Sequence, residues 1–358
     1  MNDGLLTRAE CAALRGLAII GIFLHNYCHW LGPVVKENEY TFSQHNVDWL
    51  TAVMASPDGL LHAHLVSFFG HYGVPVFLFL SAYGLELKYG RSLYAPAFRF
   101  VAYHSKKLFS MMIVGFVSFT IVDAMTPGRW HYTLTQVVAQ LAMVNNLLPD
   151  PDHNIWPGPF WFFGLMLQLY VVYRLLLYKR HWAWTAGAMV VCLGVQLAFA
   201  PESEALNWYR YNFMGGMLPF GLGLLYARYG NRIILTNLNT LSLLVSVVFC
   251  GFMVMWMSAS YLLWSVVPLV VCILCVYVVK LLSQAARRPV GAWLMERLVW
   301  MGEISAALFV IHPVLRKVFI PISRHGDIYT GLLLYAIAAI GAAWLIRLVM
   351  TKIPKPQM

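Results

Sequence analysis

Long apolar stretches alternate with short polar segments along the whole chain. Windows of about 20 apolar residues are typical of membrane-spanning helices. Ten such windows lie at residues 12–31, 66–87, 107–125, 159–178, 183–200, 214–229, 238–257, 260–280, 298–320 and 328–349. A run at 134–148 is shorter and carries four amide side chains, so we expect an interfacial or re-entrant segment there. The pattern predicts an all-α polytopic membrane protein of about ten transmembrane helices, with one domain over residues 1–358 and no soluble domain.

The composition agrees with this class. Hydrophobic residues make up 60% of the chain and charged residues 11%, whereas soluble domains carry about 25% charged residues. The net charge of +10 is therefore interpreted as a topology signal and not as a nucleic-acid footprint. The first apolar run is too long for a cleavable signal peptide and lacks a small-residue exit, so we expect a true first span.

The cationic residues suggest an orientation. With ten spans, most of the 25 Lys and Arg residues fall in the segments on the side of the two termini. The positive-inside rule then predicts that both termini are cytoplasmic, in a multi-pass protein of the cell (inner) membrane. The expected partner at this level is the lipid bilayer.

The first span contains the least expected polar residue of the chain, His25. Arg15 precedes it by ten residues, roughly 15 Å along a helix, and can reach the membrane interface, whereas His25 lies too deep to do so. His71, Asp123 and His312 fall at a similar depth in other spans. A single buried histidine is usually structural, but several ionisable residues at one level indicate a polar cavity.

Two further patterns are interpreted as structural. His29 follows His25 by four residues and such a pair can bind zinc, but no Glu follows the first histidine as in metalloproteases, and we expect no metal. Cys272 and Cys275 form a C-x-x-C inside an apolar run, where small residues on a helix face account for them better than redox chemistry.

Two polar surfaces remain open to two interpretations each. Segments 32–65, 126–158 and 201–213 mix aromatic residues with Asn, Asp and Glu, which suits a sugar but also an interfacial aromatic belt. At the opposite end, Arg15 and the start of the third span, with Lys106 and Lys107, suit a phosphate-bearing ligand. The positive-inside rule alone also predicts cations there.

Four segments resemble motifs of the acyltransferase-3 family of integral-membrane O-acyltransferases, in the family's order. They are Leu14 to His25, Gly73 to Tyr83, Pro159 to Tyr170 and Gly302 to Pro313. The chain departs from the family in having nine residues, not the usual ten, between Arg15 and His25, which rotates Arg15 by about 100° around the helix. A lysine pair, Lys106 and Lys107, also replaces the arginines of many members and lacks their bidentate geometry.

The resemblance implies transfer of an acyl group, expected to be acetyl, from cytoplasmic acyl-CoA to a hydroxyl of an envelope glycan or lipid-linked sugar at the outer face. Acyl-CoA would be the donor substrate, with no permanently bound cofactor. His25 would be the general base or a transient acyl carrier, Asp123 would orient it, and Arg15, Lys106 and Lys107 would bind the donor. The expected pocket and acceptor contacts are Asn26, His71, Ser81, Trp161 and His312.

A transporter or exporter of a glycan or small anionic solute is the alternative, because polar residues within spans also mark substrate pathways. Transporters often contain inverted repeats, and none is evident in the sequence. A receptor or scaffold would not account for Arg15 and His25 on one helix.

Overall fold

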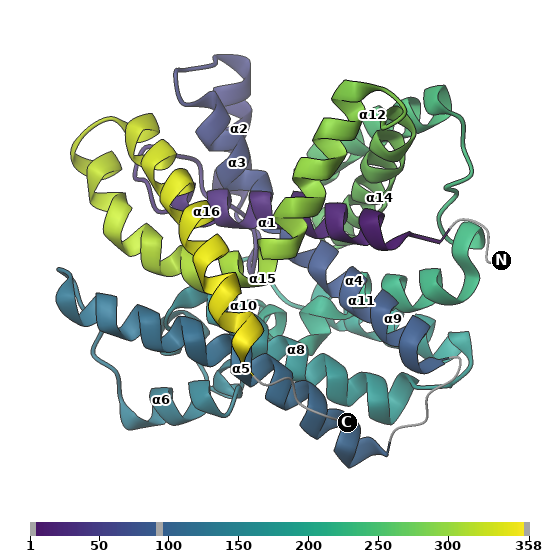
Figure 1. Cartoon of the computed structure of the whole chain (residues 1–358), viewed down its shortest axis with the longest axis horizontal. Coiled ribbons are helices and arrows are strands. Elements are labelled where there is room, and N and C mark those ends of the chain that lie inside the picture. Colours follow the sequence, from purple (N-terminus) through teal and green to yellow (C-terminus); the bar gives the residue numbers. More distant parts are fainter. Residues whose placement is uncertain (1–4, 91–95, 354–358) are drawn as a thin grey trace.

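The computed structural model describes residues 5–90 and 96–353, which form helices and, within these ranges, no strand (Figure 1). Eight helical segments in this part are long and apolar enough to cross a membrane. They are α1 (Arg8–Cys28), Leu61–Gly90 with α3 (Leu61–Phe69) and α4 (Gly73–Leu85), α5 (Ala97–Met125), Gly158–Leu177 with α8 (Trp161–Val172), α12 (Thr240–Met257), α14 (Val267–Ala285), α15 (Pro289–His325) and α16 (Ile328–Lys352). The predicted class, an all-α polytopic membrane protein, is confirmed.

The other two predicted spans are also helices, but shorter. These are α9 (Trp182–Leu197), with 16 residues, and α11 (Phe213–Tyr229), with 17. The polar run at 134–148 contains α6 (Leu134–Leu141), whose eight residues are too few to cross a bilayer, as predicted. The largest difference is α15, whose 37 residues extend beyond the predicted 298–320 at both ends. The charged residues near its ends lower the hydropathy of the window, so the apolar pattern predicts a shorter span. These residues still favour a helix and do not end it.

Besides α6, further short helices lie between the long ones. They are α2 (Gln44–Ala55), α7 (Pro151–Asn154), α10 (Glu204–Tyr211) and α13 (Tyr261–Trp264). Single turns of 3₁₀-helix occupy Gly70–Tyr72, Asn145–Leu147, Gly158–Phe160 and Gly230–Arg232, and π-helical turns occupy Glu86–Gly90 and Tyr173–Leu177.

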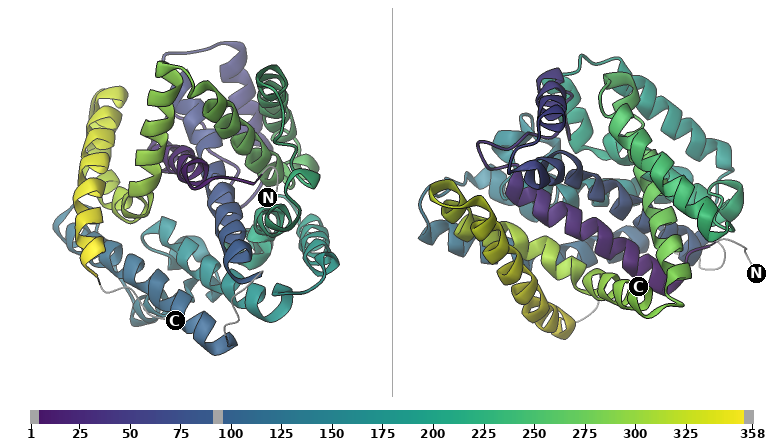
Figure 2. Two further views of the ribbon diagram at one scale, coloured as in Figure 1. Left: turned by 45° about the vertical axis from the view of Figure 1, so that its right-hand side comes forward. Right: turned by 90° about the horizontal axis from the view of Figure 1, so that it is seen from above.

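Helix α1 runs through the middle of the other helices (Figure 2). It begins at a capping box, in which the Thr7 hydroxyl accepts from the Glu10 backbone N–H and the Glu10 side chain accepts from the Thr7 backbone N–H. Its apolar side chains are buried on two faces: one, with Ile19 and Phe23, joins the cluster shared with α5, α8 and α15, and the other joins the cluster of α4, α11 and α14. A helix that is apolar on opposite faces is expected to be surrounded by protein.

Glycines allow α1 and α15 to approach closely. A Cβ added at Gly302 would overlap the Ala12 carbonyl, so this contact excludes any larger residue. The two helices run parallel, because further along Asn26 lies against Arg316 and Trp30 against Arg324. This pairing brings the end of α1 that carries His25 next to the cationic end of α15.

Candidate active site

His25 is buried at the C-terminal end of α1, with 1% of its surface exposed. Its Nδ1 lies 2.7 Å from the carbonyl oxygen of Ser67 on α3. A carbonyl can only accept, so Nδ1 carries the proton in the neutral ring and Nε2 keeps its lone pair. That Nε2 lies 3.9 Å from Oε2 of Glu39. The ring is thus held in the tautomer that a general base or nucleophile needs.

After α1 the chain folds back over the helix end as a loop, residues 29–43, which we call the return loop. Gly32 and Pro33 lie at its start, and the Lys36 ammonium group donates to the carbonyls of His29 and Leu31. His29 is the C-cap of α1, where a cation is favourable.

The return loop is fixed by hydrogen bonds to three other elements. Donors from α10 and α13 reach it: Arg210 Nε lies 2.8 Å from the Glu39 carbonyl, and Trp264 Nε1 lies 2.8 Å from the Asn38 carbonyl. The Ser67 hydroxyl of α3 donates to the carbonyl of Val35 at 2.6 Å. The loop therefore presents its acidic side chains in set positions, as a preorganised site requires.

Glu37 and His29 form a hydrogen-bonded pair within this loop. His29 Nδ1 donates to Glu37 Oε1 at 2.9 Å, and the His29 and His25 rings lie 4.8 Å apart between centroids. Among the described residues nothing bonds to the buried Nε2 of His29. The pair has the arrangement in which a carboxylate orients an imidazole and stabilises its protonated form.

The two acidic residues of the loop differ in protonation. Burial, reinforced by the charge of Glu37, raises the pKa of Glu39 to about 8. Burial would also raise the pKa of Glu37, but the adjacent His29 charge and hydrogen bond, together with His25, lower it overall. At neutral pH, Glu37 is a carboxylate and Glu39 is a carboxylic acid that can donate a hydrogen bond.

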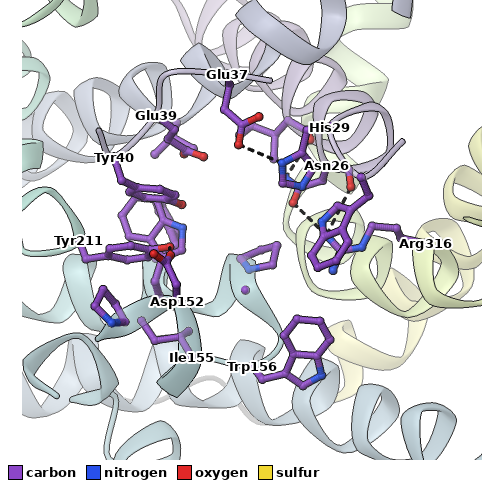
Figure 3. A pocket seen from close by; sticks show the side chains of 18 of the residues that line it. Asn26, His29, Glu37, Glu39, Tyr40, Asp152, Ile155, Trp156, Tyr211 and Arg316 are labelled. Atoms are coloured by element: carbon purple, nitrogen blue, oxygen red, sulfur yellow. Dashed lines mark hydrogen bonds and ion pairs between the residues drawn. The ribbon is translucent and has the colours of Figure 1, made fainter. Parts of the chain in front are cut away.

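A cavity of about 320 Å³ lies against this cluster. Figure 3 shows Tyr40, Tyr211 and Asp152 on one side of it, and His29 and Arg316 on the other. The Tyr40 and Tyr211 rings are stacked at 3.9 Å, and the Tyr211 hydroxyl donates to Asp152 at 2.8 Å. Flat aromatic faces beside hydrogen-bonding groups are suited to a sugar.

A smaller cavity, of about 40 Å³, lies on the other side of His25. His71 and Arg210 line it, and Glu39 and Trp161 line both cavities. His25 lines neither cavity. The centroid of its ring lies 4.8 Å from that of His29 and 5.6 Å from that of His71. His25 is therefore in ring contact with one residue that lines each space.

The structure brings together some of the predicted pocket residues. Asn26 and Trp161 line the larger cavity and His71 the smaller one. His312 is buried in α15 and its Nδ1 lies 3.1 Å from the Leu308 carbonyl of the same helix. The Ser81 hydroxyl lies 3.4 Å from that of Tyr170, and Ser81 lines neither cavity.

Asp123 is engaged elsewhere, contrary to its predicted contact with His25. Its Oδ1 lies 2.7 Å from the Lys317 ammonium and its Oδ2 accepts from the Trp130 backbone N–H at 2.8 Å. The Ser67 carbonyl orients His25 instead. For the predicted donor site, Lys106 and Lys107 are exposed on α5 and Arg15 is partly buried on α1. Their contact with acyl-CoA remains a prediction.

A family described as an acyltransferase domain, of the acyltransferase-3 type, matches residues 10–348, nearly the whole chain. The chain belongs to the acyltransferase-3 family. The protein is thus a membrane acyltransferase, and the cavity beside His25 is its candidate active site. Comparison with curated proteins and with solved structures gave no match.

Several residues of the acyltransferase site did not emerge from the sequence. No sequence pattern distinguishes Glu37 and Glu39, although the Gly32–Pro33 turn directly after α1 indicates a chain that returns toward the helix end. The spacing of His29 from His25 indicates only a possible zinc ligand. With His25 and Glu37 it offers ligand atoms that all lie within 4.8 Å of one another. In the structure His29 Nδ1 and Glu37 are joined by a direct hydrogen bond.

Proposed function

We propose that this acyltransferase moves an acetyl or similar small acyl group from cytoplasmic acyl-CoA to a hydroxyl of an envelope glycan or lipid-linked sugar. The observation that carries the proposal is the pair of adjacent imidazoles, His25 and His29, at the wall of an aromatic and polar cavity. Acyl transfer to a hydroxyl requires a base that is neutral near pH 7, and imidazole meets this requirement with little tuning.

The reaction is a substitution at the thioester carbonyl. The acceptor hydroxyl loses its proton to an imidazole Nε2 while its oxygen forms a C–O bond to the acyl carbon. The C–S bond then breaks, and the CoA sulfur leaves and takes up the proton from the imidazolium. His25 acts as this base, or it carries the acyl group transiently on Nε2 before the hydroxyl attacks.

His29 and Glu37 serve the acceptor side of the same step. His29 lines the larger cavity, whereas His25 lies behind it, so where His25 carries the acyl group, His29 is the base that takes the proton from the bound hydroxyl. The Glu37 carboxylate stabilises the resulting imidazolium. Glu39, protonated at neutral pH, can donate a hydrogen bond to the oxygen on which negative charge develops.

The donor would enter from the opposite, cytoplasmic end of α1. Arg15, Lys106 and Lys107 would hold the CoA phosphates there, and the pantetheine arm, which is long enough for the roughly 15 Å between Arg15 and His25, would bring the thioester to His25. This arrangement assumes the orientation with both termini in the cytoplasm. Family membership favours an enzyme over the transporter alternative.

The test uses the purified full-length protein in a sugar-free, uncharged detergent with radiolabelled acetyl-CoA. We expect acetyl-CoA hydrolysis, and transfer to added envelope glycans, by the unaltered protein. His25→Ala should abolish both, whereas His62→Ala, at an exposed position on α3, should retain them. Size-exclusion profiles and unfolding temperatures verify that both variants are folded. Full activity in His25→Ala would refute the role of His25, and no acetyl-CoA turnover by the unaltered protein would refute the proposal.

A further inference from the structure

A third cavity, of about 370 Å³, lies next to the candidate active site, and we call it the basic groove. Trp30, Trp156 and Arg316 line both the groove and the larger active-site cavity. Lys317, Arg324 and His325 complete its polar lining. The two spaces therefore adjoin along these three shared residues.

Arg316, at the junction, is a buried cation with no acidic partner. Its exposed fraction is 5%, and among residues 5–90 and 96–353 it takes part in no ion pair. Its contacts are long hydrogen bonds to the backbone and side-chain oxygens of Asn26, at 3.3 and 3.4 Å, and the face of Trp30 at 4.8 Å. A buried charge without a counterion is costly, so an anionic ligand would relieve this cost.

The other cations of the groove differ in whether they are already neutralised. Lys317 is paired with Asp123 at 2.7 Å. Arg324 is exposed, donates to the Trp30 carbonyl at 3.0 Å, and has no ion pair in the described part of the chain. Two guanidinium groups, those of Arg316 and Arg324, are thus free to bind an anion through their forked donors.

The active-site cavity has the opposite character. Glu37 and Asp152 line it, so an anion is disfavoured there while hydroxyl groups find acceptors. Between the two spaces, the Trp30 and Trp156 rings meet edge to face at 6.1 Å, and Trp130 stacks on Trp156 at 5.0 Å. Tryptophan faces at the junction can pack against a sugar ring that extends from one space into the other.

We infer that the acceptor is an anionic sugar, bearing a carboxylate or phosphate that binds Arg316 and Arg324 while its reacting hydroxyl lies in the active-site cavity. This inference rests on the proposed function, because it names the acceptor class for the same site. The same guanidinium groups could meet the phosphate of a bilayer lipid, and the experiment separates these two sources.

The test compares ligands by their effect on the unfolding temperature of the purified protein in sugar-free, uncharged, phospholipid-free detergent. The probes are methyl glucuronide, glucose 6-phosphate, methyl glucoside and inorganic phosphate. The two charged sugars should stabilise the protein at concentrations at least tenfold below those needed for methyl glucoside or inorganic phosphate. Equal effects of charged and neutral sugars would overturn the inference. An equal effect of inorganic phosphate would assign the groove to any phosphate, including that of a lipid, and would overturn it as well.

Amino-acid substitutions test which residues bind the charged sugars and so raise the unfolding temperature. Arg324→Gln, at an exposed position, should weaken the charged-sugar effect roughly tenfold or more. Arg316→Lys keeps the charge but loses the fork and should weaken it as well. Arg129→Gln is the matched control, because Arg129 is an exposed cation that follows Gly128 of the groove but does not line it. An undiminished effect in Arg324→Gln and Arg316→Lys would refute the site. Acetyl-CoA turnover in the same samples reports separately on the proposed function.

Discussion

The Nδ1 atom of His29 lies 2.9 Å from Oε1 of Glu37, within the loop that folds back over the end of α1. This contact joins a carboxylate to an imidazole whose other nitrogen is buried at the cavity. Replacing Glu37 by Gln removes the charge that stabilises the imidazolium and can reverse the ring's tautomer. We therefore expect kcat for acyl transfer to fall about 10²- to 10⁴-fold in Glu37→Gln and in His29→Gln.

The matched control is Glu303→Gln, since Glu303 forms an exposed ion pair with Arg347 at 2.9 Å on the surface of α15 and α16. That substitution should change kcat less than twofold. Combining Glu37→Gln with His29→Gln should cost little more than either alone, because both residues act in one step. Additive losses would show that the two residues work independently.

The raised pKa of Glu39 predicts a pH-dependent stability. The folded protein holds the Glu39 proton up to about pH 8, whereas the unfolded chain releases it near pH 4.3. Between these values the folded state binds more protons, so the free energy of unfolding falls as the pH rises. The unfolding temperature should decrease between pH 5 and pH 8 more steeply in the unaltered protein than in Glu39→Gln. Glu202→Gln, at an exposed position, should leave the slope unchanged. Parallel curves for all three proteins would contradict the burial of an acid at residue 39.

The close approach of α1 and α15 predicts that Gly302 does not tolerate a side chain. Gly302→Ala would push the helices apart and should destabilise the protein by about 1–3 kcal/mol. Activity should fall as well, because α15 carries Arg316 to its place beside Asn26. Gly341→Ala on α16 meets no atom within 4 Å and should be neutral or slightly stabilising. Denaturation in detergent measures the stability of both variants. Equal stabilities of Gly302→Ala and the unaltered protein would show that the helices can separate without cost.

The lysine pair of α5 predicts an effect on donor binding alone. Exposed cations hold phosphates through long-range charge, so Lys106→Gln with Lys107→Gln should raise KM for acetyl-CoA about tenfold and leave kcat unchanged. The difference should shrink at high salt. Arg129→Gln, far along the chain from this pair, should leave KM unaltered. A change in kcat with constant KM would place the lysines outside the donor site.

The histidine cluster also predicts insensitivity to chelators. His25, His29 and Glu37 present ligand atoms that all lie within 4.8 Å of one another, but His29 Nδ1 and Glu37 Oε1 are joined by a direct hydrogen bond at 2.9 Å. Prolonged treatment with a strong chelator should leave acyl transfer unchanged. Loss of activity that zinc restores would assign these three residues to a metal.

The helical pattern of this protein could be predicted because a bilayer imposes a simple rule on sequence. Every backbone polar group in hydrocarbon must be paired, so long apolar runs become helices. Each of the ten predicted spans corresponds to a helix, and the amide-rich run at 134–148 contains only short ones. His25 lies inside an apolar run, where an ionisable residue is costly and rare, and the structure buries its side chain.

The partners of His25 could not be predicted in the same way. Ser67, Glu37 and Glu39 lie 42, 12 and 14 residues beyond it in the chain, and their positions depend on a loop that hydrogen bonds from α3, α10 and α13 hold in place. Asp123 has a suitable depth, but Lys317 and the Trp130 backbone bind its carboxylate. Depth along the membrane normal is a one-dimensional property, and it does not specify which helices are neighbours.

By itself, the sequence determined the all-helical membrane class, the approximate positions of the helices and the family motifs. Only the tertiary structure placed Glu37 against His29, stacked Tyr40 on Tyr211 and set Arg316 between two cavities. The physical reason is that helix formation depends on local hydrophobicity and backbone pairing, whereas a site depends on close contacts between distant segments. Here those contacts arise where glycines let α1 and α15 meet and where the return loop is tied down over the end of α1.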